Sequence, residues 1–176
     1  MSAAPKRALL IIAPERFRDE ELAEPRRALE GAGCRVTIGS TRGGTATGML
    51  GARVAVEVTL AQASAADFDV LVIVGGAGAP EHLWDSEPLR GIAKSLHAAG
   101  KPIGAICLSP PVLARAGILA GKRATIYPSS RALVELKRGG ATYVEEPVVQ
   151  DGTIVTASGP AAAEAFGHTL VQLLTT

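Results

Sequence analysis

Residues 102–116 read PIGAICLSPPVLARA. The first part, Pro102–Ile106, is a short apolar run of strand length. Further on, Pro110 and Pro111 begin a segment that can form a helix, since proline is tolerated in the first turn of a helix. Cys107 stands between the two, with the small residues Ala105 and Ser109 two positions before and after it. A sharp strand-to-helix turn that exposes a nucleophile needs small residues at those places. The stretch therefore predicts a nucleophile elbow with Cys107 at its tip.

The same alternation of strand and helix runs along the whole chain. Apolar or alternating runs predict strands at Ala8–Ala13, Arg35–Ser40, Ala52–Leu60, Asp69–Val74, Pro102–Ile106 and Arg123–Ile126. Thr41–Gly51 reads as a turn or small hairpin, and Val148–Gln150 with Thr153–Thr156 as a hairpin around Asp151 and Gly152. Helices are expected at Asp19–Gly31, Pro88–Ala99, Pro110–Ala116, Ser130–Lys137 and Pro160–Leu174. This order predicts one doubly wound α/β domain over residues 1–176, with a mostly parallel sheet between helical layers.

Composition excludes several classes of function. Apolar residues make up 47% of the 176 residues, charged residues 20% and aromatic residues 3%, and the net charge is +1. These values give no reason to expect nucleic acid or an anionic membrane as a partner. No apolar run is long enough to cross a bilayer, and two cysteines make no disulfide framework, so we expect a cytoplasmic protein. Three scattered histidines predict no metal site, and we expect no cofactor.

The position of Cys107 also predicts a reactive thiolate. A cysteine at the start of a helix lies near unpaired N–H groups and the positive end of the helix dipole, and both lower the pKa of a thiol. The alternative is a buried structural cysteine, because cysteine often serves as a small apolar residue. Cys34 lies between a helix stop and a strand, so we expect a core or edge thiol there.

Four segments in order resemble the ThiJ/PfpI superfamily. They are KRALLIIAPERFRDEELAEPRRALEGAGCRVTIGS (residues 6–40), FDVLVIVGGAG (68–78), GKPIGAICLSPPVLARAGILAGKRATIYP (100–128) and DGTIVTASGPAAAEAFGHTLVQLL (151–174). The resemblance implies a flavodoxin-like three-layer sandwich, a homodimer or larger assembly, and a site built from a cysteine and an acidic partner. It also implies a small-molecule carbonyl substrate of the glyoxalase or deglycase type.

The resemblance assigns further residues of the site. The acidic partner stands four residues before a helix proline, which places it at Glu21 because the proline is Pro25, with Glu20 as the next choice. A protonated carboxyl beside a thiolate donates a hydrogen bond to it, which raises the pKa of the carboxyl and lowers that of the thiol. The backbone N–H groups of Gly76 and Leu108 are the implied oxyanion donors.

The chain departs from the superfamily at three positions near Cys107. Peptidase-type members carry a histidine directly after the cysteine, and here that position is Leu108, which cannot transfer a proton. Ser109 replaces the usual glycine. Tyr127 takes the place of the histidine of the deglycase-like branch, and we expect it either to donate a hydrogen bond to substrate or to pack as a wall residue. His82 is the remaining candidate for proton transfer, although a surface or interface position is the simpler interpretation.

Three functions follow as hypotheses. The first is a cysteine-dependent enzyme acting on small reactive carbonyl compounds, with Cys107 as nucleophile and Glu21 moving protons. The second is a redox-sensing stress protein or chaperone whose Cys107 is oxidised. The third, a peptidase or amidase, is disfavoured by Leu108.

Overall fold

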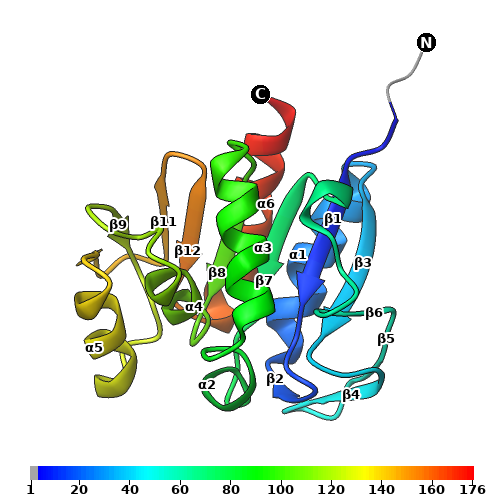
Figure 1. Cartoon of the computed structure of the whole chain (residues 1–176), viewed down its shortest axis with the longest axis horizontal. Coiled ribbons are helices and arrows are strands. Elements are labelled where there is room, and N and C mark those ends of the chain that lie inside the picture. The colour runs from blue at the N-terminus through cyan, green and yellow to red at the C-terminus, as the bar shows by residue number, and fades with distance from the viewer. Residues whose placement is uncertain (1–3) are drawn as a thin grey trace.

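The computed structural model describes residues 4–176, and a central sheet of seven strands runs through that part of the chain (Figure 1). The strand order is β11-β12-β8-β7-β1-β3-β6, and every neighbouring pair is parallel except β11 with β12. The bounds are β1 Arg7–Ile11, β3 Arg35–Ser40, β6 Val58–Thr59, β7 Val70–Ile73, β8 Ile103–Ile106, β11 Val148–Asp151 and β12 Ile154–Ala157. The mostly parallel sheet of the predicted α/β sandwich is confirmed.

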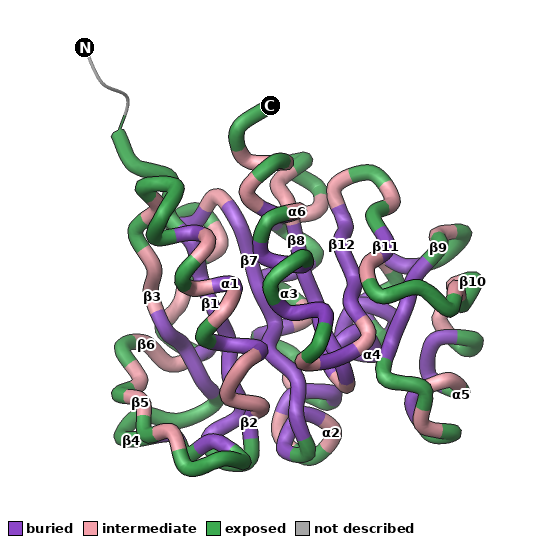
Figure 2. Tube along the Cα trace, turned by 180° about the vertical axis from the view of Figure 1, so that it is seen from behind, coloured by how far each residue is buried: buried purple, intermediate pink, exposed green. Residues whose placement is uncertain are grey.

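Helices cover both faces of this sheet, and each face has its own apolar core. Strand β1 shows why, because Leu9 and Ile11 belong to one core while Leu10 belongs to the other. Helices α1 (Asp19–Gly31) and α6 (Ala163–Thr175) close one face, and α3 (Glu87–Ala98), α4 (Pro110–Arg115) and α5 (Ser130–Arg138) close the other. Figure 2 shows the central strands buried between these layers. Continuous apolar runs in the sequence therefore reflect strands covered on both sides.

Small elements gather at the carboxyl edge of the parallel strands. A three-stranded sheet there has the order β2-β4-β5, and the short helix α2 lies beside it, at the bottom of Figure 1 and opposite the two termini. A further pair, β9 with β10, lies beyond β11. The bounds of the remaining elements are β2 Glu15–Phe17, β4 Gly44–Gly48, β5 Arg53–Val56, η1 Ala65–Asp67, α2 Ala79–His82, β9 Arg123–Ala124, β10 Thr142–Tyr143 and η2 Pro160–Ala162.

Two strand predictions were wrong in detail. Ala52–Leu60 is not one strand: β5 pairs with β4, whereas β6 pairs with β3. The break falls at Glu57, whose side chain accepts a hydrogen bond from the Ile38 N–H at 2.9 Å and so takes a place on the edge of the main sheet. The strand predicted at Arg123–Ile126 ends at Ala124, because the next N–H donates to the Thr156 hydroxyl (2.9 Å) instead of a strand carbonyl. Within residues 4–176 no helix has the length and apolar character needed to traverse a bilayer.

Candidate active site

The chain makes its predicted sharp turn at Cys107, between β8 and α4. The φ angle of Cys107 is 64°, a left-handed conformation that costs a non-glycine residue about 1–3 kcal/mol and persists only where its neighbours hold it. Its N–H donates to the carbonyl of Ala157 at 2.8 Å, and its own carbonyl accepts from the N–H of Tyr127 at 2.9 Å. The Ser109 hydroxyl donates to the Val74 carbonyl at 2.6 Å rather than capping the helix. The elbow is thus tied to the strand on each side of β8.

Glu21 is brought against Cys107 from the first turn of α1 and is fully buried. Gly75 makes this approach possible: a Cβ added there would lie 2.5 Å from Glu21 Oε1 and 2.6 Å from the Cβ of Cys107. Neither carboxyl oxygen makes a hydrogen bond of ordinary geometry within the described residues. Burial raises the pKa of Glu21 to about 7, although the Cys107 thiol, the Gly75 N–H and the charge of Arg18 all act to lower it. Glu21 is therefore a carboxyl that holds its proton close to neutral pH.

The expectation of a low pKa for Cys107 is wrong while Glu21 is ionised. Burial, followed by the negative charge of Glu21, raises the pKa of Cys107 to about 12. Hydrogen bonds from the N–H groups of Gly76 and Leu108 lower it, but they do not outweigh these two effects. The helix contributes little because α4 has only six residues and its first two, Pro110 and Pro111, carry no N–H. The acidity of the thiol thus depends on where the Glu21 proton lies.

Cys107 opens onto a pocket of about 260 Å³. The pocket is lined by Arg18, Met49, Gly76, Ala77, Cys107, Leu108, Tyr127 and Pro160. Tyr127, half exposed, and Pro160 also border a second hollow of about 440 Å³ that includes Glu145 and Glu146. The structure therefore places Cys107, Gly76, Leu108 and Tyr127 in the wall of one cavity, and the buried Glu21 lies against Cys107 without lining the cavity itself.

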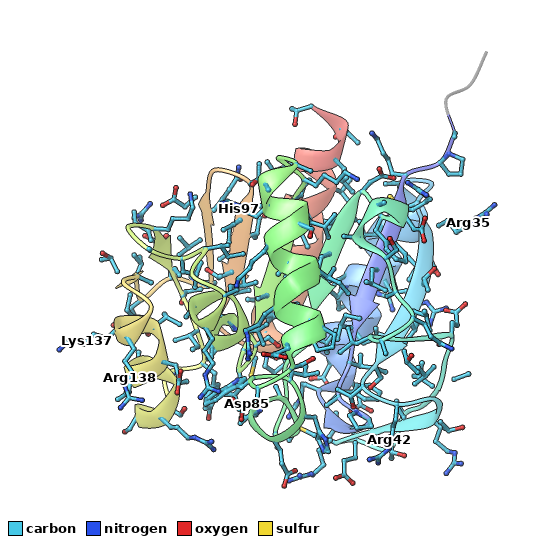
Figure 3. All side chains as sticks on the ribbon, in the orientation of Figure 1. Arg35, Arg42, Asp85, His97, Lys137 and Arg138 are labelled. Atoms are coloured by element: carbon cyan, nitrogen blue, oxygen red, sulfur yellow. The ribbon has the colours of Figure 1, made fainter. Side chains whose placement is uncertain are left out.

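His82 is not part of this cavity. Its Nε2 lies 3.2 Å from Glu15 Oε1 and 3.6 Å from Glu81 Oε2, and both of these carboxylates are exposed. Among the described residues these three side chains form the one group with metal-ligand spacing, and the guanidinium of Arg16 already pairs with Glu81. His97 lies at the end of α3 farthest from Asp85, away from the carboxyl edge (Figure 3). Within residues 4–176 no histidine is among the residues that line the cysteine pocket.

Sequence reasoning missed Trp84. Its side chain is buried, and its indole N–H donates to the Leu108 carbonyl at 2.6 Å, so it holds the residue directly after Cys107. The guanidinium groups of Arg115 and Arg131 lie over the ring, at 5.4 and 4.8 Å from its centroid. The indole therefore links the elbow to α4 and α5. The sequence signal was weak, since a single tryptophan is usually only a core residue.

Replacing Trp84 by phenylalanine should destabilise the elbow. The change keeps an aromatic ring but leaves the part-buried Leu108 carbonyl without its donor, which costs about 1–3 kcal/mol in the free energy of unfolding. Alkylation of Cys107 should also change rate, because the Leu108 peptide is free to rotate. Urea unfolding followed by circular dichroism and mass-spectrometric labelling measure both effects, with Tyr143→Phe as an exposed aromatic control. Unaltered stability and labelling would show that this hydrogen bond does not hold the elbow.

A doubly wound α/β sandwich with a cysteine at the tip of a strand-to-helix elbow defines the class of protein. Residues 6–173 match the DJ-1/PfpI family, and the chain belongs to that family. It is 47% identical over 168 residues to an uncharacterised protein of Methanocaldococcus jannaschii, covering 96% of this chain and 82% of that protein. It is 35% identical to a protein of Pyrococcus horikoshii named as a deglycase, covering 94% of this chain and 98% of the relative. The crystal structure of a ThiJ/PfpI domain protein from Brachyspira murdochii superposes with a TM-score of 0.92 at 31% identity, covering 98% of each chain.

Proposed function

We propose that this protein is a cysteine-dependent enzyme that converts small 2-oxoaldehydes, with Cys107 as the nucleophile and Glu21 as the proton-transfer group. The observation that carries the proposal is the buried pair itself: the Cys107 thiol lines a 260 Å³ pocket, the Glu21 carboxyl lies beside it, and the N–H groups of Gly76 and Leu108 donate to the sulfur. Relatives named as deglycases support chemistry on carbonyl compounds.

The pair supplies a thiolate by sharing one proton. Above about pH 7, the pKa of Glu21, the two groups together carry one negative charge. When the remaining proton lies on Glu21, the charge that raises the pKa of Cys107 is gone, and the neutral carboxyl donates a hydrogen bond to the sulfur. The N–H groups of Gly76 and Leu108 favour this same state. The nucleophile is therefore the thiolate of a Cys107–Glu21 pair whose proton has moved to the carboxyl.

The reaction then follows from these groups. The thiolate adds to the aldehyde carbon, a C–S bond forms, and the carbonyl oxygen takes the proton of Glu21 to give a hemithioacetal. The Glu21 carboxylate next removes the proton on that carbon, and electrons move to the neighbouring ketone to give an enediolate. Glu21 then returns this proton to the former ketone carbon, while the proton of the hemithioacetal hydroxyl passes to the former ketone oxygen, which leaves a 2-hydroxy thioester. Water hydrolyses the thioester and releases the thiolate. The sum is one 2-oxoaldehyde and one water converted to one 2-hydroxy acid, with no redox partner.

Methylglyoxal turnover tests the proposal. Purified protein should consume methylglyoxal and form lactate, and Cys107→Ala should lower the rate about 1,000-fold or more, because a nucleophile has no substitute. Cys34→Ala is the matched control and should leave the rate unchanged, since Cys34 lies outside the pocket.

Light scattering on the same sample tests the expected dimer or larger assembly, which a monomer at micromolar concentration would contradict.

The other two hypotheses make different predictions in the same assays. Amide cleavage needs an acid that protonates the departing amine; Leu108 cannot supply one, and His82 does not line the pocket. Robust Cys107-dependent digestion of casein would therefore overturn the proposal in favour of a peptidase. A protein that consumes no aldehyde and cleaves no peptide, yet forms a sulfinic acid at Cys107 with mild peroxide, would instead be the redox-sensing stress protein.

A further inference from the structure

Arg18 is the one charged side chain among the residues that line the cysteine pocket. Its lining neighbours Met49, Ala77, Leu108 and Pro160 are apolar, so water is partly excluded around the guanidinium and a bound charge is screened less than at an open surface. A cation in such a place attracts an anion more strongly than a surface arginine does. The pocket thus has a feature that methylglyoxal, which is neutral, does not use.

The guanidinium is held in place before any ligand arrives. The backbone N–H of Arg18 donates to the carbonyl of Gly75 at 2.9 Å, and Gly75 is the same glycine that admits Glu21 to the site. In the side chain, Nε and Nη2 both lie 3.0 Å from one oxygen of Glu20. Within residues 4–176 nothing accepts a hydrogen bond from Nη1, and the side chain keeps 30% of its surface exposed. Glu20 therefore fixes the Nε–Nη2 edge of the guanidinium, and Nη1 is available to bind a ligand.

We propose that Arg18 forms an anion subsite and that the preferred substrates are 2-oxoaldehydes that carry a carboxylate. The substrate class rests on the function proposed above, because the aldehyde end reacts with Cys107 while the carboxylate end binds Arg18. Arg18 is already paired with Glu20, so its charge offsets part of the single negative charge of the Cys107–Glu21 pair, which would otherwise repel an anionic substrate more strongly. For 4,5-dioxopentanoate the sum is one substrate and one water converted to 2-hydroxypentanedioate, by the same thioester step.

Alkylation with two matched reagents tests the subsite without requiring turnover. Iodoacetate and iodoacetamide attack the same thiolate and differ in that one carries a carboxylate where the other carries an amide. The iodoacetate-to-iodoacetamide rate ratio at Cys107 should exceed the ratio at Cys34, the internal reference, by about 10-fold or more. Arg18→Gln should lower the Cys107 ratio about 10-fold or more. Arg18→Lys should give a ratio between those of Arg18→Gln and the wild type, since lysine keeps the positive charge but lacks the planar guanidinium. Effects of the variants on the pKa of Cys107 cancel in the ratio.

Turnover of two further probes tests the substrate class. Wild-type protein should show a kcat/KM for 4,5-dioxopentanoate about 10- to 100-fold above that for the uncharged 2-oxopentanal, which is the range of a charge-assisted hydrogen bond. Arg18→Gln should remove most of this preference. Arg42→Gln is the control for a change of net charge, because Arg42 is exposed near β4 and outside the pocket (Figure 3).

The outcomes separate this inference from the proposed function. The anion subsite is overturned if the iodoacetate-to-iodoacetamide rate ratio at Cys107 equals the ratio at Cys34, or if Arg18→Gln does not change it. This holds whether or not the protein consumes aldehydes. A ratio that responds to Arg18 in a protein that consumes neither aldehyde supports the subsite and contradicts the proposed function. Equal kcat/KM values for the two aldehydes contradict the substrate class.

Discussion

Replacing Gly75 by alanine should abolish the reactivity of Cys107. The added Cβ would lie 2.5 Å from Glu21 Oε1, 2.5 Å from the Ile106 carbonyl oxygen and 2.6 Å from the Cβ of Cys107. Two of these neighbours belong to the elbow, which cannot retreat without breaking its ties to the adjacent strands. The methyl group therefore separates the thiol from the carboxyl, or moves the elbow. We expect a loss of about 2–3 kcal/mol in the free energy of unfolding, as for an overpacked core, and a fall in methylglyoxal turnover of about 100-fold or more.

The matched control is Gly91→Ala in α3. A Cβ there meets nothing within 4 Å, and alanine is the better helix former by about 1 kcal/mol, so this variant should be slightly more stable and fully active. Urea unfolding and iodoacetamide labelling of Cys107 read out both variants. If Gly75→Ala retains wild-type labelling and turnover, the close approach of Glu21 to Cys107 is not required for the chemistry.

Replacing Glu21 by glutamine should lower activity while making the protein more stable at alkaline pH. The folded protein holds the Glu21 pKa near 7, above the ordinary 4.5, so the native state binds this proton more tightly than the unfolded chain does. The contribution of Glu21 to stability is then greatest below about pH 4.5 and declines as the pH rises toward 7, because the unfolded chain releases this proton in that range while the native state still holds it. The difference amounts to about 3 kcal/mol and stays lost above pH 7. Glutamine does not ionise, so the variant should lack this decline.

The activity of Glu21→Gln should fall by about 100-fold or more, because the amide can neither give nor take the proton that the reaction moves. Iodoacetamide labelling of Cys107 in the wild type should rise as the pH passes through about 7, and this step should be absent from the variant. Denaturation at a series of pH values gives the stability difference. Glu30→Gln, at an exposed site on the same helix, is the control and should match the wild type. Parallel stability curves for wild type and Glu21→Gln would show that this carboxyl is not the buried titrating group.

Local pattern in the sequence determined the elements and the elbow. Runs such as Asp69–Val74 have no polar interruption, and strands covered on both faces need none. The small residues around Cys107 predict the sharp turn before any packing is known, and the interval between Glu21 and Pro25 pointed, through the family resemblance, to the carboxyl that the structure places beside Cys107. Each of these signals lies within a few residues of the feature that it predicts.

The tertiary structure alone decided how these parts act on one another. The pKa of Cys107 departs from the sequence expectation because burial and the charge of Glu21, which is 86 residues away, outweigh two amides and a helix that begins with prolines. Arg18 enters the pocket because its backbone is bound to the turn after β7, and Trp84 holds Leu108 from a third segment. Desolvation and charge depend on distance in space, and no periodicity along the chain records which segments meet at the carboxyl edge of the sheet.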